Sequence, residues 1–387
     1  MTTTINNEHK KLNVPNLRFP EFQGEWKKTK FGDIATGFDY GMNAAAKNYD
    51  GENKYIRITD IDEASSTYTD KDIVSPDGIL TDNYLVNNRD ILLARTGAST
   101  GKSYLYKKSD GKLYYAGFLI RANVTTHDPY FVFSQLHTHR YWRWVSIMSA
   151  RSGQPGINSQ EYSSFPIYTT SIAEESKIAK LLSLLDERIA TQNKIIEDLK
   201  MLKSAISKKL LCNDKWTTYK IQDIAEIGRG RVISSVEIDR QKHPLYPVYS
   251  SQTSNDGIMG YLDNYMFDGE YITWTTDGAN AGTVFYRKGK FNCTNVCGTL
   301  KIHPKFDCYF VSLVLQQATQ KYVSSNLANP KLMNNTMASI KIKMPNTETQ
   351  KQLSKVFQTL NSCLLVHQRT CKMYLSEKQY LLRQMFI

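Results

Sequence analysis

Two glycine-bearing turns are the first segments of this sequence whose residue types could support chemistry. Gly97-Ala-Ser-Thr-Gly101-Lys102-Ser103 has the composition of a phosphate-binding loop, in which backbone N–H groups cradle a nucleotide. That motif needs four residues between its glycines, and three stand here. Gly278-Ala-Asn-Ala-Gly282 keeps both glycines but is not followed by Lys-Ser. We therefore reject nucleotide binding and expect a tight strand-to-strand turn at both places.

Cysteine chemistry is the second candidate. A zinc site would draw on Cys293, Cys297, His303 and Cys308. An earlier, similar segment carries Lys112 and Ala116 in place of Cys293 and Cys297. We expect no metal, and we expect reduced thiols in a cytoplasmic protein because the six cysteines follow no disulfide framework.

The sequence offers no set of residues for catalysis. The seven histidines share no spacing with a nucleophile, and no pair of carboxylates recurs along the chain. The Asn/Asp-Pro-Pro-aromatic motif of amino-methyltransferases, a glycine-rich cofactor loop and the acidic–Glu-x-Lys pattern of nucleases are all missing. We expect a protein that is not an enzyme by itself and that holds no cofactor.

Basic residues near aromatic or glycine residues point instead to nucleic acid. In the run Arg140-Tyr-Trp-Arg-Trp144 we expect a helix in which both tryptophans pack and at most one arginine reaches a DNA backbone. Gly228-Arg229-Gly230-Arg231 is the better candidate, which we interpret as a flexible basic loop, with a solvated turn as the alternative. The net charge of +12 and a pI near 9.2 favour a polyanionic partner.

An internal duplication organises all these segments. Trp26-x4-Phe31-x-Asp-Ile-Ala35 recurs 190 positions later as Trp216-x4-Ile221-x-Asp-Ile-Ala225. The two glycine turns lie 181 positions apart, and Pro155-x-Ile157 matches Pro330-x-Leu332 at 175. Duplication on this scale predicts two like domains, related by a pseudo-two-fold axis or a translation, so that one chain imitates a homodimer.

Two long helices follow the two copies. The stretches 171–211 and from 347 onward contain no Gly or Pro, and their apolar residues recur in alternating steps of four and three, the pattern of a coiled coil. The two seams coincide at an offset of 175. The first seam comprises Ile178, Leu182, Leu185, Ile189, Gln192, Ile196 and Leu199, and the second comprises Leu353, Phe357, Leu360, Leu364, His367, Cys371 and Tyr374. We expect the helices to pack on each other, with Gln192 and His367 fixing their register; two independent surface helices are the alternative.

Together these patterns predict an α+β protein with five segments. They are a polar tail (1–16), a first domain (17–165), a central helix (166–212), a second domain (213–345) and a final helix (346–387). The expected strands include Lys54–Asp60, Asp90–Ala94, Tyr271–Trp274 and Gly298–Ile302. The apolar share of 41% suits globular domains, and no stretch approaches the roughly 20 apolar residues of a membrane span.

In order and duplication, these elements resemble the specificity (S) subunit of type I restriction–modification enzymes. The resemblance covers nearly the whole chain and rests on the Trp-x4-[Phe/Ile]-x-Asp-Ile-Ala starts, the Gly-Ala-x-x-Gly turns and Gln154-Pro-Gly-Ile-Asn158. Tyr246-Pro-Val-Tyr-Ser-Ser-Gln252, Asn255-Asp-Gly-Ile-Met-Gly-Tyr261 and the helix start Glu174-Glu-Ser-Lys-Ile-Ala179 add to it. The second copy departs from the pattern, with Ala328-Asn-Pro-Lys331 for the Gly-Gln-Pro form.

The resemblance implies two target recognition domains, each reading half of a split double-stranded DNA site. The paired helices, joined as an antiparallel coiled coil, would set the half-site spacing and dock two methylation subunits. Restriction/translocase subunits would complete the assembly, and S-adenosylmethionine, ATP and Mg would bind to those partners rather than to this chain. We expect Arg95, Lys102, Arg229 and Arg231 to touch DNA phosphates. We also place Arg151, Gln154, Asn158, Asn280, Lys331 and Asn334 at the DNA interface.

Two other functions fit the same domains. The chain could be a stand-alone DNA-binding regulator or architectural protein, or a scaffold whose coiled coil binds only proteins. Copurification with a methylation subunit separates the first function from both alternatives, and a DNA pull-down separates the two alternatives from each other.

Overall fold

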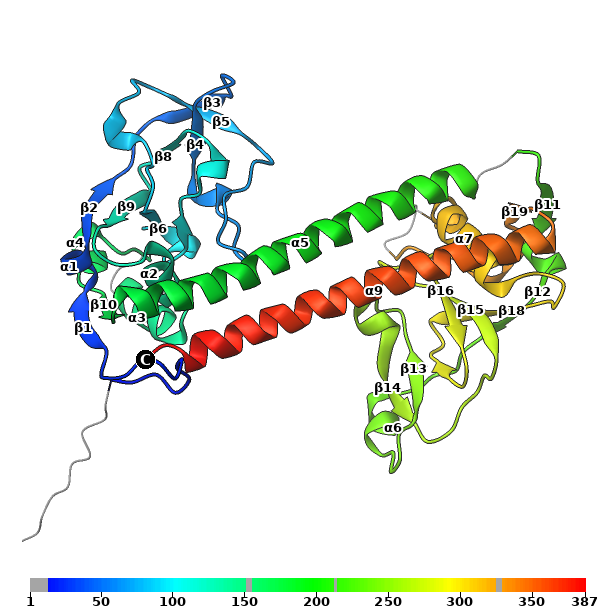
Figure 1. Ribbon diagram of the computed structural model, residues 1–387. Coiled ribbons are helices and arrows are strands. Elements are labelled where there is room, and N and C mark those ends of the chain that lie inside the picture. Colours follow the sequence, from blue (N-terminus) through cyan, green and yellow to red (C-terminus); the bar gives the residue numbers. More distant parts are fainter. Residues whose placement is uncertain (1–12, 151–154, 212–213, 325–328) are drawn as a thin grey trace, which may run out of the picture. The chain divides into compact units, whose positions relative to one another are not determined.

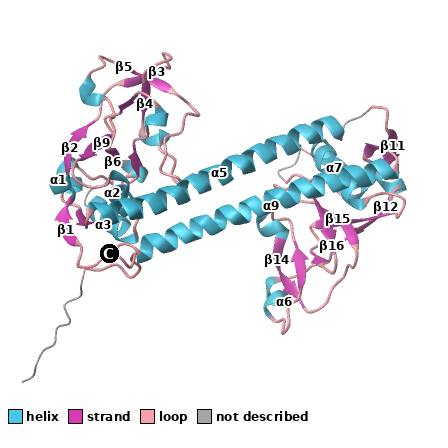
Figure 2. Ribbon diagram, in the orientation of Figure 1, coloured by secondary structure: helices cyan, strands magenta, loops and turns pink. Residues whose placement is uncertain are grey.

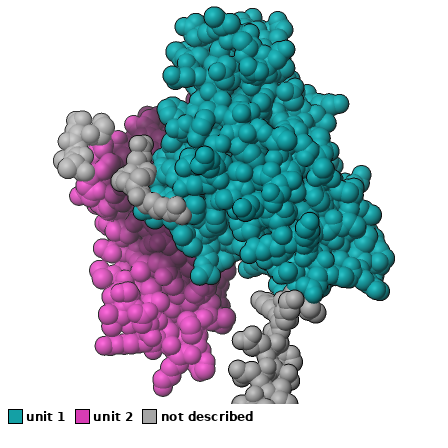
Figure 3. Space-filling model, turned by 90° about the vertical axis from the view of Figure 1, so that its left-hand side faces the viewer, with its two compact units in different colours: residues 1–194, 368–387 teal, residues 195–367 magenta. Residues whose placement is uncertain are grey.

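A computed structural model describes residues 13–150, 155–211, 214–324 and 329–387 (Figure 1). It divides into two compact units, residues 1–194 with 368–387 and residues 195–367, which Figure 3 colours separately. Each unit holds one domain of strands and short helices, together with parts of the long helices α5 (Ile172–Leu210) and α9 (Thr347–Gln384) (Figure 2). The expected α+β class with two similar domains and two long helices is confirmed.

The first domain is built on a four-stranded antiparallel sheet of order β2-β9-β6-β7. Its strands are β2 (Ala35–Tyr40), β9 (Leu119–Val124), β6 (Asp90–Ala94) and β7 (Ser103–Leu105). Three small sheets surround it: β1 (Lys27–Lys30) with β10 (Pro166–Thr169), β3 (Ala45–Asn48) with β5 (Val74–Asp77), and β4 (Lys54–Ile56) parallel to β8 (Leu113–Tyr115). Strand β6 is buried along its whole length, as its run of apolar residues requires.

Short helices cover this sheet: α1 (Phe31–Ile34), α2 (Pro129–Gln135), α3 (His139–Ser149) and α4 (Ser159–Ser163). On α3, Tyr141 and Val145 are buried and Trp144 packs against the core, whereas Trp142 is 43% exposed. The prediction that both tryptophans pack was therefore wrong for Trp142. A helix turns by about 100° per residue, so residue 142 lies at the flank of the face that carries residues 141, 144 and 145, where its ring contacts Tyr141 but stays partly exposed.

The second domain repeats this plan. Its four-stranded sheet has the order β12-β18-β15-β16, with β12 (Ala225–Arg229), β18 (Cys297–Ile302), β15 (Glu270–Thr275) and β16 (Val284–Lys288). Beside it β11 (Thr217–Lys220) pairs with β19 (Lys341–Met344), and β13 (Tyr246–Tyr249) lies between β14 (Ile258–Leu262) and β17 (Asn292–Cys293). The helices are α6 (Ser235–Asp239), α7 (Cys308–Ala318) and α8 (Asn334–Ser339).

Strand pairing follows the duplication. Antiparallel β1 and β10 join Lys27 to Thr169, and β11 and β19 join Thr217 to Met344, as the sequence offsets require. Each domain also has one parallel pair, β4 with β8 and β13 with β17. The range 166–212, which we assigned to a helix, thus begins with strand β10, and α5 starts only at Ile172.

Three of the expected strands are confirmed and one is shorter than predicted. Strand β6 matches its expected range, and β15 and β18 contain theirs. The predicted strand over 54–60 ends at Ile56, and residues 58–60 form a turn of 3-10 helix. The Asp60 carboxylate causes this turn, because it accepts hydrogen bonds from the Arg57 backbone N–H at 2.8 Å and from the Arg57 guanidinium at 2.8 and 2.9 Å.

The two long helices run antiparallel within the first unit. Lys378 Nζ contacts Asp186 Oδ1 at 2.6 Å, and Cys371 Sγ contacts Asn193 Oδ1 at 3.3 Å, so α9 runs back as α5 runs forward. Within the second unit, Ile206 and Leu211 share a core cluster with Leu353 and Phe357.

The predicted heptad seam coincides with the covered face of each helix. In α5, Ile178, Leu182, Leu185, Ile189 and Ile196 are buried, and Gln192 and Leu199 are half-buried. In α9, Phe357 and Cys371 are buried, and Leu353, Leu360, Leu364, His367 and Tyr374 are half-buried. A role of these residues in docking other subunits stays a prediction.

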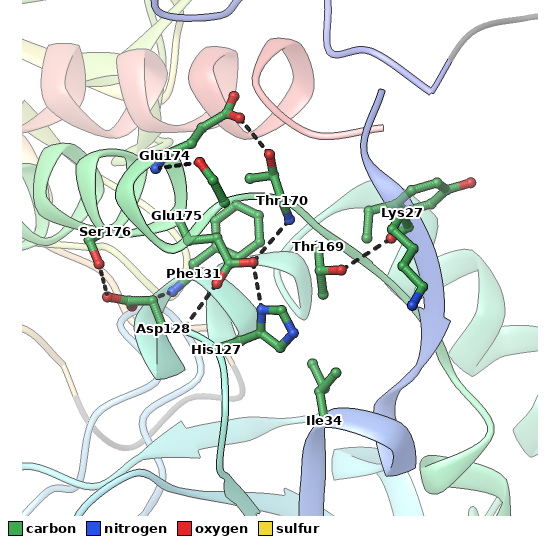
Figure 4. A network of polar contacts seen from close by, with 12 residues as sticks. Lys27, Ile34, His127, Asp128, Phe131, Thr169, Thr170, Glu174, Glu175 and Ser176 are labelled. Carbon is green, nitrogen blue, oxygen red and sulfur yellow. Dashed lines mark hydrogen bonds and ion pairs between the residues drawn. The ribbon is translucent and has the colours of Figure 1, made fainter. Parts of the chain in front are cut away.

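Two buried glutamates fix the start of α5 to the first domain (Figure 4). Glu174 accepts from Arg18 Nε and Nη2, both at 2.7 Å, and from Thr170 Oγ1 at 2.6 Å. Glu175 accepts from the backbone N–H groups of Thr170 and Asp128, both at 3.0 Å, and contacts His127 Nδ1 at 2.9 Å. Burial raises the pKa of Glu175.

Gln350 takes the place of Glu175 in the second domain. Its Oε1 accepts from the Asp307 backbone N–H at 3.0 Å, and its Nε2 donates to the Pro345 carbonyl at 2.8 Å. Pro345 corresponds to Thr170 in the repeat and has no N–H to donate. The local donor set therefore explains why one copy has a carboxylate and the other an amide.

Residues from far along the chain complete the core of the first unit. The Phe386 ring lies against Trp26 at a centroid distance of 6.1 Å and against Phe131 at 5.4 Å. The Leu17 N–H donates to the Gln384 carbonyl at 2.8 Å. Segments 13–26 and 381–387 are thus held together in this unit.

Candidate nucleic-acid interface

Four segments meet at one end of the main sheet in each domain. They are the last strand residues of β2 or β12, the glycine turn after β6 or β15, the turn before β9 or β18, and the segment before α4 or α8. We call this region the rim. It comprises residues 40, 95–102, 117–118 and 155–159 in the first domain, and residues 229–231, 276–283, 295–296 and 329–334 in the second.

The same backbone hydrogen bonds build both rims. Gly97 N–H donates to the Pro155 carbonyl at 3.0 Å, and Gly278 N–H donates to the Pro330 carbonyl at 3.0 Å. The Arg95 carbonyl accepts from Ile157 N–H, and the Thr276 carbonyl accepts from Leu332 N–H, both at 2.9 Å. The glycine turn and the proline segment are therefore one structural unit in each domain.

The glycine turns behave as expected from the duplication. Gly97 and Gly101 have φ of 70° and 93°, and Gly278 and Gly282 have φ of 94° and 83°, a region that favours glycine. The chain continues from the turn into β7 or β16, each antiparallel to the strand before the turn. A phosphate-binding loop would lead into a helix, so the rejection of nucleotide binding and the strand-to-strand turn are consistent with the fold.

In the first rim, Arg95 lies over the ring of Tyr40 at 4.7 Å. Tyr40 is 43% exposed, and the neighbouring Phe118 is 62% exposed. Lys102 points to Glu63, with 3.2 Å between Nζ and Oε2. A cation stacked on an accessible aromatic ring offers both charge and flat apolar surface to a nucleic acid.

Asn158 has a local structural role as well. Its side chain caps α4 by accepting from the Glu161 backbone N–H at 2.9 Å, and the Glu161 carboxylate accepts from the Asn158 N–H at 2.9 Å. Arg151 and Gln154, which we also expected at the interface, lie outside the described residues.

The second rim gathers two of the predicted residues around one carboxylate that we did not predict, and a third lies beside them. Asp277 Oδ2 lies 3.2 Å from Arg229 Nη2, and Asp277 Oδ1 lies 3.8 Å from Lys331 Nζ. Asn334 Nδ2 donates to the Gly228 carbonyl at 3.4 Å, next to Arg229 in the chain. Arg229, Lys331 and Asn334 thus form one cluster.

The other two predicted residues of this domain lie apart from that cluster. Arg231 forms an ion pair with Glu237, and Asn280 Nδ2 donates to the Ser251 carbonyl at 3.0 Å. Both residues are still accessible at least in part. Whether any of these side chains touches DNA stays a prediction.

The segment Gly228-Arg229-Gly230-Arg231 is not the flexible loop that we expected. Strand β12 extends to Arg229, which pairs with Gly298 of β18. A Cβ atom on Gly230 would lie 2.1 Å from the Cys293 carbonyl oxygen, so this glycine allows a close approach of two backbones. The expectation of a loop was wrong for Gly228 and Arg229, which lie in β12, and Gly230 serves packing.

One rim residue, Tyr40, escaped the sequence analysis because of a β-bulge. Tyr40 pairs with Ile120 and Arg229 pairs with Gly298, which places Tyr40 and Arg229 at equivalent positions of the two sheets. The bulge between Gly37 and Asp39 shifts this correspondence by one residue from the offset of 190. An alignment that allowed one extra residue in β2 would have paired the two.

The remaining chemistry is sparse. The described residues include no group of three His, Cys, Asp or Glu side chains placed to hold a metal ion. Burial raises the pKa of the Cys293 and Cys297 thiols, which opposes the thiolate form that zinc requires. Across the described ranges, no helix combines the length and the apolarity needed to cross a membrane.

Comparison with known proteins places both halves of the chain in one family. The family model of the type I restriction modification DNA specificity domain matches residues 23–201 and again residues 213–372. A putative type I specificity subunit of Mycoplasma pneumoniae, named as an N-terminus, is 45% identical over 147 residues, which is 37% of this chain and 76% of that protein. A second putative specificity subunit of M. pneumoniae is 38% identical over 194 residues, 49% of this chain and 81% of that protein.

Solved structures show the same fold. The crystal structure of a type I restriction-modification system S subunit from M. genitalium matches with a TM-score of 0.73 and 16% identity, covering 97% of this chain and 99% of that one. A chain from a structure on the assembly and conformational transition of the type I R-M system matches with a TM-score of 0.53 and 13% identity, covering 93% and 97%.

Proposed function

Because the chain belongs to the type I restriction–modification DNA specificity family, with a specificity domain in each half, we propose that it reads a bipartite DNA target. Each domain contacts one half-site, and the spacer between them is not read. The observation that carries this proposal is the pair of equivalent rims, each presenting basic side chains at the same end of the same sheet. Two readers in one chain recognise a split site without needing a second copy.

The long helices connect the two readers. Because α5 begins in one unit and ends in the other, and α9 returns in the opposite sense, the helix length sets how far apart the half-sites lie. Their outer faces carry exposed apolar residues, including Met201, Leu202, Val366 and Met373. Such surface suits the docking of two methylation subunits, with restriction/translocase subunits joining the assembly through them.

The chemistry belongs to those partners in this proposal. The chain positions an adenine methyltransferase and an endonuclease on DNA in the cytoplasm and does not itself transfer a methyl group or cut. S-adenosylmethionine, ATP and Mg bind to the partner subunits. The rims fit this division of labour, because the charged and polar groups described above suit binding to DNA.

Methylation mapping tests the proposal. Modified adenines are mapped across the genome in cells with and without this gene. A methylated motif of two short half-sites around an unread spacer should disappear when the gene is removed, and an unchanged map would refute the proposal. In vitro, S-adenosylmethionine and DNA should yield methylation only when the chain is combined with its methylation subunit. Methyl transfer by the highly purified chain alone would show that it is an enzyme.

A further inference from the structure

The guanidinium of Arg229 is fixed along one edge and open along the other. On the fixed edge, Nε donates to the Asn295 carbonyl, and Nη2 contacts Thr276 Oγ1 and Asp277 Oδ2, both at 3.2 Å. No acceptor within the described part of the chain contacts Nη1. The outer edge, formed by Nη1 and the second N–H of Nη2, therefore presents two parallel donors.

Asp277 is itself held in place. Thr276, which is fully buried, donates its hydroxyl to Asp277 Oδ2 at 2.6 Å. The backbone of Asp277 forms a bridge with Lys331, whose Nζ lies 3.8 Å from Asp277 Oδ1. These contacts orient the Arg229 side chain before any ligand arrives, so that less conformational entropy is lost on binding.

A guanine base fits the open edge better than a phosphate does. Guanine presents the acceptors O6 and N7 side by side in the major groove, which two parallel guanidinium N–H groups match. A phosphate would also accept these donors, but the Asp277 carboxylate repels it and offsets the charge of Arg229. The paired arginine therefore loses much of its attraction for phosphates and keeps its directional donors.

The first rim has no such arrangement. Tyr40 occupies the place of Arg229, and the backbone bridge between Thr96 and Gly156 takes the place of that between Asp277 and Lys331. Arg95 rests on the Tyr40 ring without a carboxylate partner among the described residues. Its charge is not offset, so it suits a phosphate.

We propose that Arg229 is a specificity-determining residue that reads one guanine in the half-site of the second domain, and that Asp277 is a positioning residue for its guanidinium. This inference rests on the proposed DNA recognition and adds the base that one rim selects. Arg229 changes from an expected phosphate contact to a base contact.

Selection from a randomised duplex library tests the assignment. The full chain, bound to its methylation subunit, is used as wild type and as Arg229→Lys, Arg229→Ala and Asp277→Asn. Lysine keeps the charge of Arg229 but not its fork, and asparagine keeps the size of Asp277 but not its charge. Asp214→Asn is the matched control, because it removes the carboxylate of an exposed ion pair with Lys343 on β19, outside the rim. Thermal unfolding of each variant accompanies the selection.

The wild type should require a guanine at one position of one half-site. Arg229→Ala should lose about 10- to 100-fold discrimination at that position and no other, and Arg229→Lys and Asp277→Asn should each lose part of it. The control should retain the full preference. If Arg229→Ala weakens binding to all sequences by the same factor and reduces the slope of log K against log salt concentration by about one, Arg229 is a phosphate contact. That result would overturn the inference. An unchanged guanine preference in Arg229→Ala would overturn it too. A wild-type complex without any sequence preference would refute the proposed function itself.

Discussion

The buried anchors at the starts of α5 and α9 predict that exchanging Glu and Gln destabilises the protein at both places, with opposite dependence on pH. Glu175→Gln replaces a carboxylate that accepts from Thr170 N–H, Asp128 N–H and His127. Glutamine has one acceptor oxygen, so its NH2 group must face at least one of these donors. One buried N–H then loses its acceptor, at a cost of about 1–3 kcal/mol.

The pH dependence follows from the raised pKa of Glu175. The folded state holds this proton more tightly than the unfolded chain does. The resulting stability is fully present below the unfolded pKa of about 4.3 and is lost as the pH rises through the folded pKa. Glu175→Gln lacks this titration. Its deficit relative to wild type should therefore be largest at acid pH and smaller at pH 7.

Gln350→Glu is the reciprocal change. At neutral pH it places a buried carboxylate against the Pro345 carbonyl, where Gln350 now donates, and we expect a loss of about 3 kcal/mol or more. Acid pH should relieve it, since a protonated carboxyl can donate to that carbonyl. Calorimetry across pH 4–8 measures both variants, with about 2–4 °C expected per kcal/mol for a unit of this size. Glu175→Gln at least as stable as wild type throughout, or Gln350→Glu most stable at neutral pH, would refute the reasoning.

Three further predictions follow from the helices, the first rim and the shared core. Inserting one heptad after Gln192 and another after His367 keeps both seams in register and should move the domains apart by about 10 Å. Methylation mapping should then show a longer or otherwise changed spacer between the same two half-sites. Altered half-sites at an unchanged spacer would contradict the role of the helices in setting the spacing. Arg95→Ala and Lys102→Ala should weaken DNA binding similarly on all sequences and lower the salt slope by about one each, and a residue whose removal leaves both unchanged is not a phosphate contact. Phe386→Ala should cost about 3–5 kcal/mol in the unfolding of the first unit, measured by denaturant titration, whereas a loss below about 1 kcal/mol would show that the ring does not complete that core.

The duplication and the helical seam could be predicted from the sequence because both depend on strict periodicity. Ile178, Leu182 and Phe357 recur at helical spacing and are buried, and the glycine turns keep their conformations in both copies. Helical spacing also predicts that Trp142 lies off the packed face of α3. The sequence analysis missed this because it considered the composition of the run and not the spacing of its residues.

The rest depends on contacts between distant segments. The bulge in β2 shifts Tyr40 by one residue, and nothing in the local sequence requires it. Asp277 is an ordinary acidic residue in the sequence and becomes part of a site only where β12 brings Arg229 and the segment before α8 brings Lys331. Considered alone, the glycines on either side of Arg229 indicate a flexible loop. In the fold, the Cys293 backbone comes so close to residue 230 that only glycine fits there.

The packing of Phe386 against Trp26 has a consequence for the order in which the protein folds. The entire second unit, residues 195–367, is synthesised between the two segments of the first unit, residues 1–194 and 368–387. During translation the second unit can therefore close its core while the first still lacks segment 381–387. Closing so long a stretch of flexible chain would cost more entropy than closing a short one. Within the second unit, Ile206 and Leu211 of the first long-helix segment share a core cluster with Leu353 and Phe357 of α9, and this contact shortens the loop of chain that remains to be closed. Folding of the later-made unit thereby assists completion of the earlier one.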